Sequence, residues 1–126
     1  MNAVDLGRHL SASLQSSETI GDRLRLVRQF IMDCDNSTNV EAEIADASML
    51  TGDRGWDALV AGVVEDIAYR HGAKVPSWTM GPERFTDDRW WFVTSFPALH
   101  ATAFVETPAS LANRGVFIRR ASLVNI

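Results

Sequence analysis

The apolar residues between residues 51 and 79 repeat at the spacing of an α-helix. They fall at i, i+3, i+4, i+7, i+8 and i+11: Trp56, Leu59, Val60, Val63, Val64 and Ile67. Asp53 and Asp57 stand near the expected N-terminus, where negative charge is favoured, and Gly72 follows as a left-handed stop. The pattern therefore predicts one long helix over residues 53–71, with one apolar stripe facing the core.

Three helices are predicted ahead of this one. Over residues 2–15, with Asn2 as the cap, leucines repeat every four residues: Leu6, Leu10 and Leu14. A second helix begins near Thr19, which has Asp22 three residues later, and buries Ile20, Leu24, Val27, Phe30 and Ile31. A turn-rich break follows at residues 33–39. Thr38 with Glu41 then indicates the start of a short third helix that carries Val40, Ile44 and Ala47.

The chain after Gly72 is less regular. Residues 73–94 hold two prolines and three of the four tryptophans, which predicts turns with one helical turn near residues 87–91. Ser95 is expected to cap a fifth helix that has Pro97 in its first turn, with Leu99, Ala103 and Phe104 facing inward. A sixth, short helix begins at Thr107-Pro108 and ends between Asn113 and Gly115. The run Val116–Ile118 is too short to predict a sheet.

These elements predict an all-α fold for residues 1–126, as a single compact domain of five to six helices. An irregular, Trp-rich segment separates the fourth helix from the fifth. The length of 126 residues fits one domain, and 46% hydrophobic with 22% charged residues is ordinary for a globular protein. A single cysteine excludes an internal disulfide, and no stretch has the pattern of a signal peptide or a membrane span. We therefore expect a cytoplasmic protein.

The charges are unevenly distributed along the chain. The net charge of −4 argues against non-specific binding of nucleic acid by the whole surface. Residues 33–66 contain nine acidic residues and one basic residue, Arg54, whereas residues 113–126 contain three arginines and no acidic residue: Arg114, Arg119 and Arg120. Solvated surface charge is the simplest interpretation. The tail could also fold onto the acidic middle, or the two regions could face partners.

No constellation of residues predicts catalysis or a metal site. Cys34 lies between two carboxylates, which disfavour a thiolate, and the calcium-loop pattern that begins at Asp33 fails at Thr38 and Ile44. The three histidines have no ligand spacing: His9, His71 and His100. The adjacent carboxylates Glu65-Asp66 and Asp87-Asp88 diverge on a helix and are expected to be solvated or capping. With no Gly-rich phosphate loop either, we expect a non-enzymatic protein without a cofactor.

The tryptophans favour a protein interface. Trp56 belongs to the apolar stripe and is expected in the core. Trp90 and Trp91 are adjacent, so they cannot both be buried in the same way. An exposed tryptophan beside Arg89 would suit an interface, because Trp and Arg are favoured anchors there.

Four blocks of this sequence resemble an uncharacterised family of helical proteins of high-GC bacteria. They are GDRGWDALVAG, RHGAKVPSW, DDRWWF and PALHATAFVETPASLANRGVFI, and the similarity covers about residues 51–123. Residues 51–126 therefore form the family-like region, and residues 1–50 hold the N-terminal helices. Longer relatives carry an N-terminal helix-turn-helix domain, a pattern that this sequence lacks.

The resemblance implies a partner protein. Genes of this family often lie beside a nucleotidyltransferase-like gene of the abortive-infection, toxin–antitoxin type, which implies an antitoxin-like regulator. The residues expected to bind the partner are Trp78, Arg89, Trp90, Trp91, Arg114, Arg119 and Arg120. A homodimer also stays open. The alternatives are a DNA-binding, transcription-associated regulator, with arginines on phosphates, and an enzyme that uses His71 or His100.

Overall fold

Helix α4 (Arg54–His71) is the long helix that the sequence predicts, and its ends form as expected. Asp53 is its N-cap, and its carboxylate accepts a hydrogen bond from the backbone N–H of Trp56 at 3.1 Å. Asp57 lies in the first turn. Gly72 ends the helix in the left-handed conformation, with φ of 64°. This computed structural model describes residues 1–87 and 89–124.

The remaining elements confirm an all-α fold in a single domain. The described part of the chain has six α-helices and two short strands. The other helices are α1 (Ala3–Leu14), α2 (Ile20–Asp35), α3 (Val40–Ile44), α5 (His100–Glu106) and α6 (Ala109–Ala112). The strands are β1 (Trp91–Phe92) and β2 (Val116–Phe117), and four 3-10 turns lie at Ser77–Met80, Pro82–Arg84, Pro97–Leu99 and Arg120–Ser122. Helix α2 begins with the predicted capping box at Thr19, and α1 begins at the predicted cap, Asn2, where the structure adds a capping box with Asp5.

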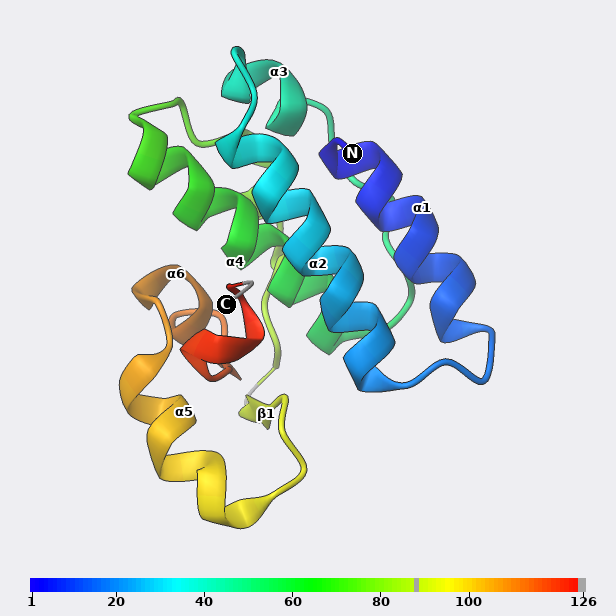
Figure 1. The fold of residues 1–126 in the computed structure, drawn as a ribbon, viewed down its shortest axis with the longest axis vertical. Coiled ribbons are helices and arrows are strands. Elements are labelled where there is room, and N and C mark those ends of the chain that lie inside the picture. Colours follow the sequence, from blue (N-terminus) through cyan, green and yellow to red (C-terminus); the bar gives the residue numbers. More distant parts are fainter. Residues whose placement is uncertain (88, 125–126) are drawn as a thin grey trace.

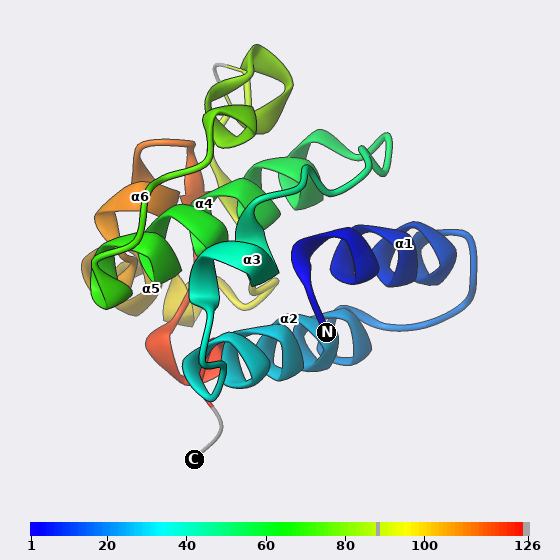
Figure 2. The ribbon, with the colours of Figure 1, turned by 90° about the horizontal axis from the view of Figure 1, so that it is seen from above.

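Helix α4 lies between two groups of elements. Helices α1 and α2 pack against each other, and α2 and α3 cover one side of α4 (Figure 1). Helix α6 and strand β2 cover another side of α4. The view from above shows α4 in the middle, between the α1–α2 pair and the α5–α6 region (Figure 2).

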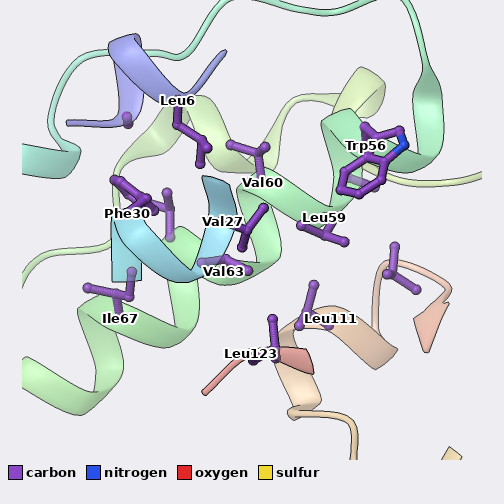
Figure 3. Close-up of a cluster of buried hydrophobic side chains, with 14 of the residues drawn as sticks. Leu6, Val27, Phe30, Trp56, Leu59, Val60, Val63, Ile67, Leu111 and Leu123 are labelled. Atoms are coloured by element: carbon purple, nitrogen blue, oxygen red, sulfur yellow. The ribbon is translucent and has the colours of Figure 1, made fainter. Parts of the chain in front are cut away.

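The core forms around α4, and this helix is buried on more sides than its apolar stripe predicts. The stripe itself is buried, and side chains such as Leu6, Phe30, Leu111 and Leu123 reach it from the other elements (Figure 3). The opposite side of α4 is buried too, through small residues: Ala58, Ala61, Gly62 and Ala68. A helix that is apolar nearly all round belongs in the middle of a fold. The apolar periodicity of the sequence predicted the burial of the large-residue side of α4 but not that of the small-residue side.

The small residues of α4 let α6 approach closely. A Cβ atom added at Gly62 would lie 2.5 Å from Cδ2 and 3.2 Å from Cα of Leu111, which is fully buried. Gly62 therefore sets the distance between the two helices.

A two-stranded parallel sheet is the element that the sequence did not predict. Trp91 pairs with Val116 and Phe92 with Phe117. Neighbouring residues in a strand point to opposite faces, so Trp91 and Val116 face α4 while Phe92 and Phe117 share the outer face. The helical turn predicted near residues 87–91 is therefore wrong at Trp91, and the prediction for Asp88 lies outside the described residues.

Other details of the prediction are also wrong. Helix α3 is capped by Asn39, whose side chain accepts from Ala42 N–H at 3.2 Å, instead of by Thr38. Ser95 caps nothing, because the chain enters α5 through the 3-10 turn at Pro97–Leu99. Pro97 does lie in the first turn, and Ala103 is buried. Phe104, predicted to face inward, is exposed.

We expect Gly62→Ala to destabilise the fold. The added methyl group would push on Leu111, and overpacking of this kind costs about 1–3 kcal/mol of unfolding free energy. Gly21→Ala is the matched control, because Gly21 is exposed on α2 and its nearest atom, Oγ1 of Thr19, lies at an ordinary 3.5 Å. Urea unfolding of both variants measures the difference. Equal stability of Gly62→Ala and the wild type would contradict the close packing of α4 and α6.

Candidate protein-binding surface

Aromatic side chains gather on the outer face of the small sheet. The ring of Phe117 is central: Trp90 meets it at 5.1 Å between centroids, Phe92 at 5.1 Å and Phe104 of α5 at 5.2 Å. Trp90 also contacts Phe104 at 5.8 Å, and His100 stacks on Phe92 at 4.3 Å. Such offset and edge contacts add to the energy of burial. The cluster thereby joins β1, β2 and α5.

The outer side of this cluster is open to solvent. Phe117 is covered, but Trp90 is 64% exposed, Phe104 52% and Val105 82%. Ala101 and Thr102 are exposed on the same short helix. We call Trp90, Ala101, Thr102, Phe104 and Val105 the aromatic face.

The aromatic face carries no formal charge. Residues 90–105 contain no Asp, Glu, Lys or Arg, in a chain that is 22% charged. The nearest charged residues along the chain are Arg89 before this stretch and Glu106 after it. Depletion of charge together with exposed aromatic side chains is typical of the centre of a protein interface.

Trp91 turns Trp90 outward. The ring of Trp91 packs on Trp56 at 5.3 Å, with 67° between the ring planes. Gly55 makes room for it, because a Cβ there would lie 2.7 Å from the Trp91 ring. The preceding residue, Trp90, therefore points away from α4. This confirms the prediction that the two adjacent tryptophans cannot be buried in the same way.

A hydroxyl group adds to the aromatic contacts that hold helix α5 in place. Thr107 Oγ1 accepts a hydrogen bond from the N–H of Ile118 at 2.9 Å and lies 3.1 Å from the carbonyl oxygen of Ile118. This ties the end of α5 to the chain just after β2. Phe104 and Val105 are thus presented from a fixed helix.

A cleft of about 410 Å³ adjoins Trp90 at the start of α4. Arg54 forms one side of it and is held in place, with Nε donating to the carbonyl of Phe85 at 2.8 Å and Nη2 lying 3.2 Å from the Asp87 carboxylate. Arg89 and Trp90 also line the cleft. The cleft therefore places charged side chains, such as Arg54 and Asp87, next to the aromatic face. Its complete lining is Asp53, Arg54, Gly55, Thr86, Asp87, Arg89, Trp90 and Trp91.

Of the residues expected to bind a partner, three lie together. Arg89 and Trp90 are exposed beside the cleft, and Trp91 forms its half-buried floor. Trp78 lies elsewhere. Its indole N–H donates to the carbonyl of Ile44 at 3.1 Å, and the guanidinium of Arg84 lies 4.8 Å above its ring, so it braces the interior.

Arg114 was predicted to bind a partner on the surface but lies in the interior. The position of Glu65, its ion-pair partner, also differs from the prediction. Arg114 is 2% exposed; its Nη1 lies 3.2 Å from Glu65 Oε1, and Nη2 donates to the carbonyl of Thr79 at 2.9 Å. Glu65, predicted to be solvated or capping, is buried on the small-residue side of α4. At this point the basic tail does fold onto the acidic middle of the chain.

The last two expected residues lie away from Trp90. Arg119 is half-buried and lines a cleft with Ile20 and Phe96. Arg120 is exposed in a cleft where α2 and α4 meet the C-terminal part of the chain, and its backbone N–H donates to Glu106 Oε1 at 3.1 Å. Neither arginine belongs to the aromatic face.

Sequence reasoning missed Phe104 and Val105. The inward prediction for Phe104 assumed that α5 packs on the core through one stripe, whereas the described contacts of α5 are chiefly with β2 and with the 3-10 turn before it. The signal that could have found both residues is the absence of charge over residues 90–105.

The side chains with the greatest chemical reactivity are either buried or bonded to neighbouring residues. Cys34 is buried, and this burial, with Glu43 and Asp35 nearby, raises the pKa of its thiol to about 12. His71 Nε2 lies 2.7 Å from an Asp35 oxygen at the end of α4. Within residues 1–87 and 89–124, no three metal-ligating side chains come together, and no helix is both long and apolar enough to cross a bilayer.

Comparison with models of protein families, with curated proteins and with solved structures finds no match.

We expect Arg114→Met to unfold the protein more easily. It would leave the carboxylate of Glu65 buried without a counter-ion, which costs about 3–5 kcal/mol, whereas Arg114→Met/Glu65→Met should recover most of that loss. Arg8→Met removes a single exposed ion pair, with Asp5, and serves as the control, with a loss below about 1 kcal/mol. Chemical denaturation measures all three. An Arg114→Met variant as stable as the wild type would show that the pair does not hold the tail on α4.

Proposed function

We propose that this chain is a non-enzymatic protein-binding module, an antitoxin-like regulator of a nucleotidyltransferase-type toxin encoded nearby. The observation that carries the proposal is the exposed, uncharged aromatic face. Trp90, Phe104 and Val105 together leave on the order of 400 Å² of apolar side chain in contact with water. A patch of this kind on a small domain is a common mark of a binding site.

The chemistry of the face suits a protein partner. Its centre offers aromatic rings on a rigid support, so these rings lose little conformational entropy when a partner packs on them. Arg89 stands beside Trp90 and has an exposed guanidinium with which to pair at the rim. The partner is expected to contribute apolar residues to the centre and a carboxylate opposite Arg89.

The family resemblance supports the same region. The face falls within two of the resembling blocks, at residues 87–92 and 97–118, and residues 53–55 of its cleft lie in a third, at residues 52–62. A toxin-like neighbour is what the resemblance implies as the partner.

The arginines favour protein binding over DNA binding. A DNA-binding regulator would present the arginines of α2 or of the tail to phosphates. Arg23 Nη2 instead donates to the carbonyl of Ser13 at 3.0 Å, and Arg28 Nη1 to the carbonyl of Ser122 at 3.3 Å. With Arg114 also buried, three of these arginines already serve the fold, and only Arg25 and Arg120 among the described arginines of α2 and the tail are exposed.

We expect the wild-type chain to co-purify with the product of the adjacent gene and to suppress its toxicity on co-expression. Val105→Arg should weaken this complex about tenfold or more, because it places an unpaired charge in the apolar centre while Val105 itself makes little contact with the fold. Tyr69→Ala is the control, since Tyr69 is also largely exposed, at 68% against 82% for Val105, but lies on α4 and outside the face. Size-exclusion chromatography with mass determination, calorimetry and growth assays give the readouts.

Two results would contradict the proposal. If the wild type neither binds nor neutralises its neighbour, the antitoxin function is wrong. If Val105→Arg binds as tightly as Tyr69→Ala and the wild type, the aromatic face is not the binding surface.

A further inference from the structure

We infer that the cleft beside Arg119 is a second binding site of this protein, which takes a small organic acid with a carboxylate on an apolar body. The cleft shares no residue with the aromatic face. Three observations support the site: the shape of the cleft, its single charge, and the lack of a described partner for Arg119. A ligand here is independent of the toxin.

Three segments that are distant in sequence form the cleft. They are the first turns of α2, the loop after β1, and the chain just after β2. Leu24, Val93 and Ile118 are buried and form the floor, whereas Ile20 and Phe96 are 39% and 68% exposed and form the rim. The cleft has a volume of about 290 Å³, which is near the lower limit for pockets that hold small molecules.

Among the described residues, Arg119 is the one charged side chain that lines this cleft. It is half-buried, and its Nε is out of contact with water and has no hydrogen-bond partner within residues 1–87 and 89–124. In the same part of the chain, no carboxylate pairs with its guanidinium. Arg89 and Arg120 are exposed, so water solvates them. Because buried donors are nearly always paired, Arg119 indicates an acceptor that enters the cleft.

Arg114 shows that an unpaired nitrogen does not by itself define a site. Its Nε also has no described partner, but its other nitrogens pair with Glu65 and with the carbonyl of Thr79 in the interior. Within the described residues, the guanidinium of Arg119 has no such partners, and Arg119 borders a cleft instead. The two features together favour a binding site.

The charges around the cleft favour an anion. No described acidic residue lines it. Arg28 stands next to it, with Nη1 donating to the carbonyl of the lining residue Ser122 at 3.3 Å. The carboxylate nearest in sequence, that of Asp22, already accepts hydrogen bonds from the N–H and the hydroxyl of Thr19, at 3.0 and 3.1 Å. Positive charge therefore dominates at the cleft, although the chain has a net charge of −4.

A carboxylate matches the donors of this cleft. A guanidinium binds the two oxygens of a carboxylate through paired N–H···O bonds. Thr94 Oγ1 accepts a hydrogen bond from the N–H of Phe96 at 3.2 Å, which leaves its own O–H to act as a donor. Ser95 and Ser122 add hydroxyl groups to the lining. A phosphate would bring a second charge, for which the described lining holds no second guanidinium.

The volume and the apolar floor define the rest of the ligand. If each non-hydrogen atom takes about 30 Å³, as a molecule of liquid water does, 290 Å³ holds roughly ten such atoms. Beside the two carboxylate oxygens, about eight carbons then remain to pack on Leu24, Val93 and Ile118. Octanoate has this composition. The C-terminal residue of a peptide offers the same chemistry, and N-acetyl-leucine represents it.

The test is an NMR titration of the ¹⁵N-labelled chain alone with octanoate and with N-acetyl-leucine. We expect a dissociation constant of roughly 0.1–1 mM for the tighter acid, since small ligands gain limited free energy per atom. The Nε–H resonance of Arg119 and the amide resonances of Thr94 and Ser95 should shift. The indole resonance of Trp90 should not. The tighter acid identifies the source of the carboxylate.

Two further compounds separate the charge from the apolar body. Octanol should bind about tenfold or more weakly than octanoate, because it lacks the carboxylate that pairs with Arg119. Acetate should also bind more weakly than octanoate, because it leaves the apolar floor uncovered.

Arg119→Met should weaken octanoate binding about tenfold or more, because it removes the guanidinium but keeps an apolar stem on the floor. The variant should unfold in urea like the wild type, since Arg119 has no described ion pair to lose. Arg25→Met is the matched control and should bind octanoate like the wild type. It removes the same charge from α2, but the side chain of Arg25 is 76% exposed and lies outside the cleft.

Each contrary outcome overturns the inference. If neither acid shifts the resonances of the cleft at concentrations well above the expected dissociation constant, the site does not exist. If octanol binds as tightly as octanoate, or Arg119→Met as tightly as the wild type, the guanidinium does not hold a carboxylate. The octanol comparison decides this point even if the variant does not fold. None of these results affects whether the aromatic face binds the toxin, which the co-expression experiment decides separately.

Discussion

The burial of α4 on nearly all sides governs how the rest of the chain is placed. One side carries large apolar residues and accepts α2 and α3. The other side is built from Ala58, Ala61, Gly62 and Ala68, and only a short, closely packed element such as α6 fits against it. Close contact there brings the C-terminal chain over Glu65, so that a carboxylate inside the fold needs Arg114 as its counter-ion. Core packing and a single ion pair thus position the tail.

The aromatic face is a consequence of the same arrangement. Strand β2, in the C-terminal part of the chain, packs against α4. Strand β1 pairs with β2, because Gly55 of α4 leaves space for the ring of Trp91. Once Trp91 is fixed inward, Trp90 must point outward. Helix α5 then covers Phe117 but leaves Phe104 and Val105 exposed. Exposure of these ordered apolar side chains to water is unfavourable for the free protein. Such exposure is consistent with a role in binding.

The sequence predicted those features that depend on nearby residues. The helices and most of their caps follow from apolar periodicity and short capping motifs, as Asp53 and Gly72 illustrate. The failures depend on contacts distant in sequence. Pairing of Trp91 with Val116 and of Glu65 with Arg114 needs the fold to bring the partners together, and no local pattern encodes either. Among the candidate site residues, Arg89 and Trp90 lie on the surface as a binding role requires, whereas Arg114 does not, because buried Glu65 attracts it inward.

The four tryptophans provide the most direct test of the claim that the aromatic face binds a partner. Their indole N–H resonances can be followed in a ¹⁵N-labelled chain while the product of the adjacent gene is added. The account predicts that the Trp90 resonance shifts or broadens. The resonances of Trp56, in the core, and Trp78, bonded to the carbonyl of Ile44, should remain nearly unchanged. A complex that forms while the Trp90 resonance stays in place would contradict the account.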